Sequence, residues 1–491
     1  MLFNSYEFLF VFLPATLALY FLLGKRSATA AIGFLALASL FFYGWWNPRY
    51  LLLLCGSVMF NYLVGRRLAQ SPARASGDQA MLWLGIAGNL ALLGTFKYAS
   101  FFAVNANALA GLALPIPHIV LPLGISFFTF TQIAYLVDAY RKEVREYRFI
   151  HYGLFVTFFP HLLAGPVLHH AEVMPQFAQA RSFRFDPENF AVGLTIFAIG
   201  LFKKVVLADG IAEFATPVFE AAGRGATLSF LAAWGGALSY TFQLYFDFSG
   251  YSDMAIGLAR LFGIVFPANF NSPYKAASII DFWRRWHMTL SRFLRDYLYI
   301  PLGGGRCHPL RRHANLMATM LLGGLWHGAG WTFVIWGGLH GLYLVLNHGW
   351  REVQNRWLGG YALPRVLGQL LTFVAVVIAW VFFRSESLAA AQAMLEGMAG
   401  MHGISKADPY YYGAPQLKGL LIMFVVAWGL PNAQQLLHRH RPVIATYADE
   451  ILAPGRLSWR PSAAWALLTA TLLITAAVNL THVSEVLYYQ F

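Results

Sequence analysis

Long apolar runs impose the main constraint on the fold of this chain. They lie at residues 8–23, 30–45, 81–96, 190–207, 314–325, 367–383, 417–430 and 463–480. Each run approaches the length that a helix needs to cross or enter a bilayer. Charged residues make up only 12% of the 491 residues, too few to cover a surface exposed to water. The sequence therefore predicts an all-α polytopic membrane protein with about eleven transmembrane helices.

Two further apolar stretches, residues 51–65 and 254–266, are short or interrupted by glycine. Backbone polar groups need partners inside a bilayer, so we expect re-entrant or interfacial helices there, beside a cavity that the protein encloses. No polar linker or repeat divides the chain, and we therefore expect one membrane domain over residues 1–491. The longest polar interruption, residues 386–416, predicts a loop with a short interfacial helix.

The formal net charge of +13 comes largely from short basic segments that we expect to be loops between helices, at residues 25–26, 66–74, 141–148, 203–204 and 284–312. Short cytoplasmic loops of membrane proteins carry such an excess of lysine and arginine. No soluble basic domain is present to dock a duplex, so we expect lipid contacts and no nucleic acid. Cys55 and Cys307 are the only cysteines, and they indicate neither a disulfide framework nor a thiolate metal site.

Charge, histidine, glycine and tryptophan mix densely at residues 245–345, which we expect to be the catalytic core. Within it, Asp281 and the glycines at 303–305 predict the start and the stop of a helix of about twenty residues. At about 100° per residue, four polar side chains of that helix fall within about 80° of one another. They are Arg284, His287, Ser291 and Arg295.

This cationic stripe has two interpretations. An interfacial helix whose arginines reach toward lipid headgroups accounts for the arginines alone. A histidine on the same stripe favours a functional role, because imidazole exchanges protons near neutral pH.

His327 lies in an apolar, glycine-rich segment with no charged neighbour in sequence. An ionisable side chain at membrane depth normally faces a cavity or a partner, and this favours a functional role. The alternative is a neutral core histidine that donates to a backbone carbonyl. On one continuous helix His340 would lie about 140° away from His327, so we expect His340 to serve packing or support.

Other polar groups carry weaker signals. Asp247 and Asp253 lie among aromatic residues and could be acid–base groups, partners of the arginines, or helix caps, of which capping is the commonest. His169, His170 and Glu172 lack dependable metal-ligand spacing, and we interpret them as interface structure, with no metal expected. The sequence contains no phosphate-binding loop, nucleophile elbow, dinucleotide fingerprint or zinc-protease helix.

Several motifs together resemble the membrane-bound O-acyltransferase family, and within it the bacterial alginate O-acetyltransferase branch. They lie at residues 251–253, 269–274, 283–291, 295–303 and 325–329. The resemblance extends from residues 4–10 to residues 488–491. It implies a ring of tilted and re-entrant helices around a central tunnel that joins a cytoplasmic opening for the donor to an acceptor opening on the far side.

The resemblance also implies roles for individual residues. His327 matches the catalytic histidine, and His287 matches a second position that is Asn in many eukaryotic relatives. Both are expected to reach the tunnel. We expect substrate to be bound by Arg284, Ser291, Arg295, Asp253 and Trp326.

The chemistry of thioester-to-hydroxyl transfer suits these residues, because it needs a base near neutral pKa and neither metal nor nucleotide. His327 would take the hydroxyl proton, while His287 would position it or stabilise the oxyanion. Direct transfer, an acyl-histidine and an acyl-cysteine on Cys307 all remain open.

The resemblance implies acetyl-CoA as the donor and no bound cofactor. It further implies periplasmic acetyltransferase proteins as partners, an exported polysaccharide such as alginate as the acceptor, and the bacterial inner membrane as the location. The nearest alternative is D-alanyl transfer to a cell-envelope polymer. A proton-coupled envelope transporter and a non-catalytic scaffold are further alternatives from other functional classes.

Overall fold

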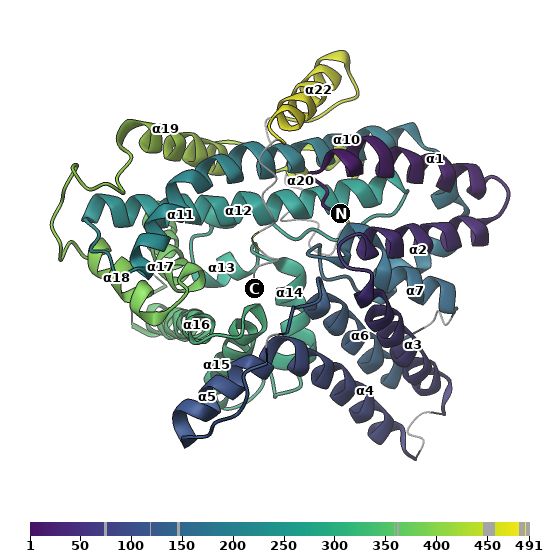
Figure 1. The fold of residues 1–491 in the computed structure, drawn as a ribbon, viewed down its shortest axis with the longest axis horizontal. Helices are drawn as coiled ribbons and strands as arrows, with labels where there is room; N and C mark the ends of the chain where they lie inside the picture. The colour runs from purple at the N-terminus through teal and green to yellow at the C-terminus, as the bar shows by residue number, and fades with distance from the viewer. Residues whose placement is uncertain are drawn as a thin grey trace. The chain divides into compact units, whose positions relative to one another are not determined.

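The computed structural model describes residues 1–72, 76–117, 119–144, 148–357, 359–360, 363–444, 457–480 and 487. Over these residues the chain forms helices and connecting segments, with one isolated bridge between Pro267 and Ile444 and no strand (Figure 1). The prediction of an all-α protein is therefore confirmed. Arg74 and Arg145 of the basic segments, and residues 488–491 of the resemblance, lie outside the described residues.

All eight apolar runs are helical. Among the described residues, four helices are long and apolar enough to cross a membrane: Arg49–Gln70, Asp78–Ala110, Pro187–Gly223 and Arg365–Arg384. Four runs form shorter apolar helices, at Phe8–Gly24, Ala28–Gly44, Gly413–Gly429 and Ala463–Val478. The run at residues 314–325 lies in α15 (Pro309–His327). This pattern supports a multi-pass membrane protein, while the count of about eleven spans stays a prediction.

The glycines in the two short stretches do not interrupt a helix. Residues 51–65 lie inside α3 (Arg49–Gln70), which has 22 residues and is long and apolar enough to cross a membrane, while a re-entrant or interfacial placement stays a prediction. A Cβ on Gly65 would overlap the ring of Tyr135, and this glycine therefore allows close helix packing rather than ending a helix. Residues 254–261 likewise continue α12 (Phe230–Leu261).

The polar interruption at residues 386–416 contains a short helix as expected, while the interfacial position of that helix stays a prediction. It contains the short helix α18 (Leu388–Met398) and then a non-helical connection to α19 (Gly413–Phe424).

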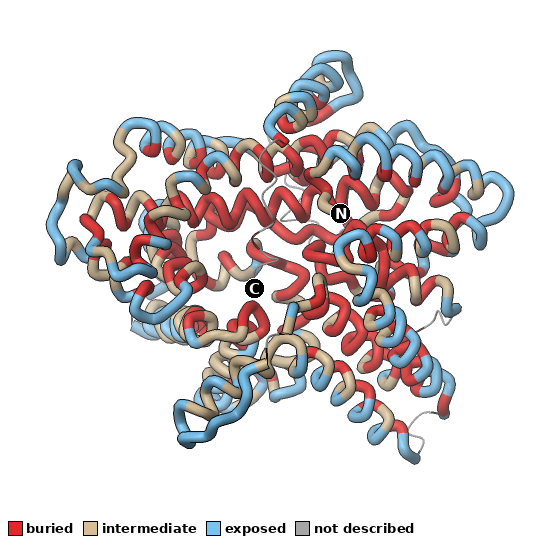
Figure 2. The backbone as a smooth tube through the Cα atoms, viewed as in Figure 1, coloured by how far each residue is buried: buried red, intermediate tan, exposed pale blue. Residues whose placement is uncertain are grey.

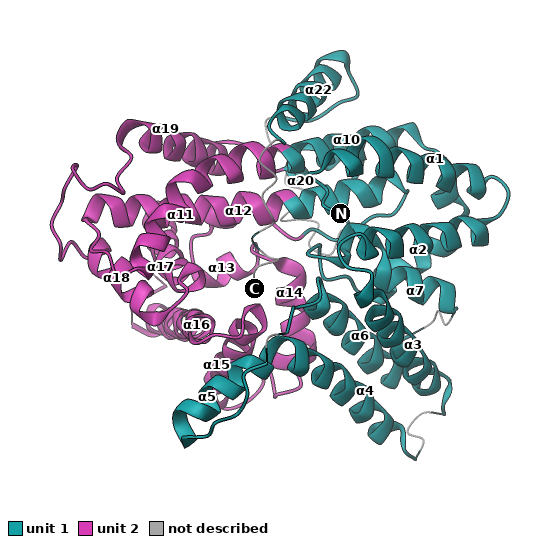
Figure 3. Cartoon of the chain, in the orientation of Figure 1, with its two compact units in different colours: residues 1–201, 251–268, 433–490 teal, residues 202–250, 269–432, 491 magenta. Residues whose placement is uncertain are grey.

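The chain divides into two compact units (Figure 3). The first comprises residues 1–201, 251–268 and 433–490, and the second residues 202–250, 269–432 and 491. The boundary between residues 250 and 251 falls inside α12. The single membrane domain over residues 1–491 stays a prediction.

In the first unit, α4 packs against α3 and α6, α1 packs against α2, and α2 packs against α7. Its helices are α1 (Leu13–Gly24), α2 (Ala28–Gly44), α3, α4 (Asp78–Leu93), α5 (Ala99–Ala110), α6 (Ile125–Tyr140), α7 (Phe149–Thr157), α8 (Phe159–Leu162), α9 (His170–Val173), α10 (Pro187–Phe202, whose last residue belongs to the second unit), α20 (Ala433–Leu436) and α22 (Ala463–Val478).

In the second unit, α15 packs against α16, α16 against α17, and α17 against α18. Its helices are α11 (Asp209–Gly223), α13 (Ile279–Trp283), α14 (Met288–Leu294), α15, α16 (Trp331–Trp357), α17 (Arg365–Arg384), α18 and α19.

The core of α12 holds a buried ion cluster. Every residue from 241 to 259 is buried (Figure 2). The Lys204 ammonium, only 1% exposed, lies 2.7 Å from a carboxylate oxygen of Asp209 and 2.7 Å from one of Asp247. Lys204 sits in a π-helical turn within the continuous helix Pro187–Gly223, so its placement in a loop between helices was wrong. A buried charge is tolerated when it is paired, as here.

The backbones of α15 and α16 touch where two glycines face each other. A Cβ on Gly324 would overlap the carbonyl oxygen of Phe333, and a Cβ on Gly337 would overlap that of Met320. Small residues allow membrane helices to approach this closely. The glycines near His327 therefore hold the two helices together.

We expect Gly337→Ala to destabilise the protein by about 1–3 kcal/mol, because the added methyl group forces the two backbones apart. Gly338→Ala is the matched control, since its Cβ would meet Leu321 at an ordinary 3.5 Å. Thermal unfolding in detergent compares the two variants. Equal melting temperatures would show that the glycine contact does not limit the packing.

Candidate active site

The predicted helix from Asp281 to the glycines at 303–305 is broken. α13 ends at Trp283, α14 begins at Met288, and His287 between them has a left-handed backbone with φ 42° and ψ 54°. Ser278 rather than Asp281 caps α13, because its hydroxyl accepts from the Asp281 N–H at 3.2 Å. Both the continuous helix and the Asp281 cap were therefore wrong.

Because of this break, the four residues of the cationic stripe do not share one helix face. His287 is completely buried, whereas Arg284 and Arg295 are exposed. The guanidinium of Arg295 instead binds the adjacent carboxylate of Asp296 at 2.6 and 3.0 Å. Ser291, in the middle of α14, donates its hydroxyl to the carbonyl of Trp286 at 3.3 Å. The structure separates the histidine from the arginines that the helical period had grouped with it.

The segment at residues 269–271 holds the break in place. The Asn271 N–H donates to the Arg285 carbonyl at 2.9 Å, and the Met288 N–H donates to the Asn269 carbonyl at 2.9 Å. These two bonds flank His287 and keep the chain out of a helix. A left-handed residue other than glycine costs about 1–2 kcal/mol, and the surrounding bonds offset this strain.

Asn269 also determines how the His287 ring is protonated. Its side-chain oxygen lies 3.0 Å from Nδ1 of His287, 2.9 Å from the Thr289 hydroxyl and 3.4 Å from the Thr289 N–H. A backbone N–H can only donate, so the amide oxygen rather than the nitrogen faces this side. Nδ1 of His287 must then carry a hydrogen. In the neutral ring Nε2 therefore bears a lone pair.

His327 lies close to His287 within the second unit. The two ring centroids are 6.5 Å apart, and His327 is 5% exposed. The His327 ring contacts Trp326 at 4.8 Å, Trp336 at 5.0 Å and Phe383 at 5.3 Å between ring centroids. As the last residue of α15, His327 lies at the negative end of the helix dipole, which stabilises the charge that the ring gains with a second proton.

His340 packs against Trp336, the residue that contacts His327. The Trp336 ring contacts both His327 and His340, at 5.0 and 4.9 Å between centroids. His340 is fully buried and also contacts Trp283 and Trp380. The prediction of a packing role agrees with these contacts, although α15 ends at His327 and the angle on one continuous helix does not apply.

Asp247 and Asp253 both lie inside the unbroken α12, so the capping interpretation was wrong. Asp247 pairs with the Lys204 ammonium at 2.7 Å. Asp253 belongs to the first unit, whereas both histidines belong to the second, and its carboxylate accepts from the side chain of Gln434 at 2.8 Å. Sequence reasoning missed Lys204, although a lysine in an apolar run is a usable signal.

We expect His287→Asn to unfold within about 1 kcal/mol of wild type, because asparagine tolerates the left-handed region and its amide can donate to Asn269. His287→Val should lose about 1–3 kcal/mol, since a β-branched residue strains this backbone and leaves the Asn269 oxygen without that donor. Melting temperatures in detergent test the ranking. A valine variant as stable as the asparagine variant would contradict the assigned geometry.

Comparisons with known proteins identify the family of this chain. The sequence model described as "MBOAT, membrane-bound O-acyltransferase family" matches residues 76–389. A peptidoglycan O-acetyltransferase of Helicobacter pylori is 44% identical over 482 residues, covering 89% of this chain and 90% of the relative.

Two further relatives carry related names. A protein of Pseudomonas aeruginosa named "probable alginate O-acetylase AlgI" is 43% identical over 476 residues, covering 94% of this chain and 88% of the relative. A teichoic acid D-alanyltransferase of Streptococcus thermophilus is 27% identical over 281 residues, covering 53% of this chain and 68% of the relative. This multi-pass membrane protein belongs to the membrane-bound O-acyltransferase family and is an acyltransferase.

Proposed function

We propose that the chain transfers acetyl groups from cytoplasmic acetyl-CoA across the bacterial inner membrane for O-acetylation of an exported polysaccharide such as alginate. The observation that carries the proposal is the pair of buried imidazoles, His287 and His327, with ring centroids 6.5 Å apart. The relatives named for O-acetylation of alginate and of peptidoglycan support an acetyl group and a polysaccharide acceptor.

In the proposed reaction, His327 accepts the hydroxyl proton as the oxygen attacks the thioester carbonyl, and returns it to the departing thiolate. The end of α15 supports this role, because the helix dipole favours the charged ring. Of the two roles considered for His287, positioning suits a ring that is protonated at Nδ1. Its Nε2 then accepts a hydrogen bond from substrate, whereas oxyanion stabilisation would need an N–H at that atom.

The remaining proposed contacts concern the substrates. Trp326 contacts both histidines and would line the path of the acyl group. The exposed Arg284 would bind the phosphates of the donor, with Arg295 and Ser291 nearby in sequence. Asp253, whose carboxylate accepts from the side chain of Gln434, stays a proposed substrate-binding residue.

The wider assignment also stays a proposal. It places residues 245–345 as the core of one membrane domain around a tunnel, and periplasmic acetyltransferase proteins as partners that complete polysaccharide acetylation. D-alanyl transfer is the second candidate, supported by the relative that shares 27% identity over about half of this chain. Family membership sets aside the transporter and the scaffold.

We expect His327→Gln to insert and unfold like wild type yet to lose about 100-fold or more of acetyl transfer, because a general base contributes about that much. His340→Gln is the matched control, since it removes a second buried imidazole one contact away and should retain most activity. Transfer of labelled acetyl groups from acetyl-CoA in membranes measures the effect. A well-folded His327→Gln protein with wild-type activity would place the base elsewhere.

The donor contact predicts a separate effect. Arg284→Gln should raise the KM for acetyl-CoA by about tenfold and flatten its salt dependence, because a charged hydrogen bond contributes about 1.5–3 kcal/mol. Arg295→Gln should raise the KM for acetyl-CoA less, because the Arg295 guanidinium is already paired with the carboxylate of Asp296. Arg356→Gln is the control, because Arg356 is an exposed arginine paired with Glu352, and this substitution should leave the KM unchanged. An unchanged KM for Arg284→Gln would leave this arginine a role in lipid contact alone.

A further inference from the structure

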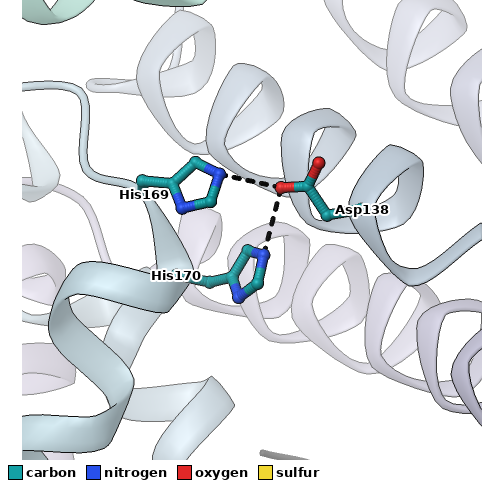
Figure 4. Close-up of side chains that lie close together, drawn as sticks. All are labelled: Asp138, His169 and His170. Carbon is teal, nitrogen blue, oxygen red and sulfur yellow. Dashed lines mark hydrogen bonds and ion pairs between the residues drawn. The ribbon is translucent and has the colours of Figure 1, made fainter. Parts of the chain in front are cut away.

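A second polar cluster lies in the first unit, separate in sequence from the proposed catalytic core. Asp138 in the last turn of α6 and the consecutive His169 and His170 form it (Figure 4). Nε2 of His169 lies 2.9 Å, and Nε2 of His170 3.0 Å, from the same carboxylate oxygen of Asp138. All three of these atoms lie within 4.8 Å of one another.

We propose that Asp138, His169 and His170 form a binding site for a divalent transition-metal ion of the zinc class. Two imidazole nitrogens and one carboxylate oxygen are a ligand set that Zn²⁺ accepts, at about 2.0–2.2 Å from each atom. Ligand atoms at such distances lie about 2.9 Å apart at a right angle and about 3.4 Å apart at the tetrahedral angle. The Nε2 atoms of His169 and His170 lie 2.9 and 3.0 Å from the Asp138 oxygen, within this range, so small movements of the side chains would admit the ion.

The surroundings provide both confinement and access. Asp138 is 1% exposed and the His170 side chain 5%, and the Tyr135 ring packs edge-on against His170. The His169 side chain is 28% exposed, which gives an ion a way in from outside. The two histidine rings stack with centroids 4.7 Å apart, so both present Nε2 to the same oxygen.

The charges nearby also matter. The negative end of the α6 dipole lies at Asp138 and favours a cation. Arg141 opposes it, but its guanidinium contacts the other carboxylate oxygen at 3.9 Å and is 39% exposed, so it can turn away. The Ala171 N–H donates to Nδ1 of His169 at 3.3 Å, which places the ring proton of the neutral imidazole on Nε2. Metal binding shifts that proton to Nδ1 and gives up this long contact.

The ion would be structural. It would link the end of α6 to the segment that leads into α9, a connection made otherwise by hydrogen bonds between the same side chains. No step of the proposed acyl transfer needs it.

Zinc content tests the site without reference to activity. The full-length protein, carrying no polyhistidine tag, is stripped with a chelator in detergent, dialysed against Zn²⁺ or Mg²⁺, and analysed by mass spectrometry for bound metal. We expect about one zinc per chain and no retained magnesium, and a melting temperature that rises with zinc. His169→Gln and Asp138→Asn should weaken zinc binding by more than the roughly 10- to 100-fold that an outer-shell partner contributes.

The matched control is His440→Gln, because His440 forms a single histidine–carboxylate pair with Glu188 at 2.7 Å in the same unit and should leave zinc binding unchanged. If Asp138→Asn fails to fold, the partly exposed His169→Gln decides the question. Wild type without bound zinc, or His169→Gln with the zinc content of wild type, would overturn the site and leave a hydrogen-bonded cluster only.

Discussion

The contact between the backbones of α15 and α16 is the constraint on which the proposed site depends. Gly324 and Gly337 meet with no space for a side chain, which sets the distance between the two helices. Trp336, one residue before Gly337, is thereby held against His327 at the end of α15. Lipid supplies no hydrophobic force between membrane helices, so close packing of this kind takes its place.

The helices could be predicted from sequence, because long apolar runs can satisfy their backbone in a bilayer only within themselves. The pairing of His287 with His327 followed from family motifs rather than from periodicity. The break at His287 could not be predicted locally, since Asp281 to Arg295 has the composition of a helix. Its cause is the pairing with Asn269, 18 residues away along the chain.

Two polar clusters were missed for a related reason. Asp138 is 32 residues from His170 along the chain. Lys204 and Asp247 lie on two different helices, so no local spacing in the sequence links either pair of partners. The sequence shows which polar residues are isolated in apolar segments, but it does not show which residue of another helix pairs with each of them. In a chain with so few charges, each buried charge identifies a contact between helices better than apolar periodicity does.

The arrangement around Lys204 bears on how the chain enters the membrane. The helix Pro187–Gly223 precedes α12 in the chain, so Lys204 leaves the ribosome before Asp247 does. Asp209, five residues farther along the same helix, binds the ammonium at 2.7 Å and offers a counter-charge within the segment itself. The helix can therefore be inserted with its lysine already paired, and Asp247 completes the cluster when α12 follows.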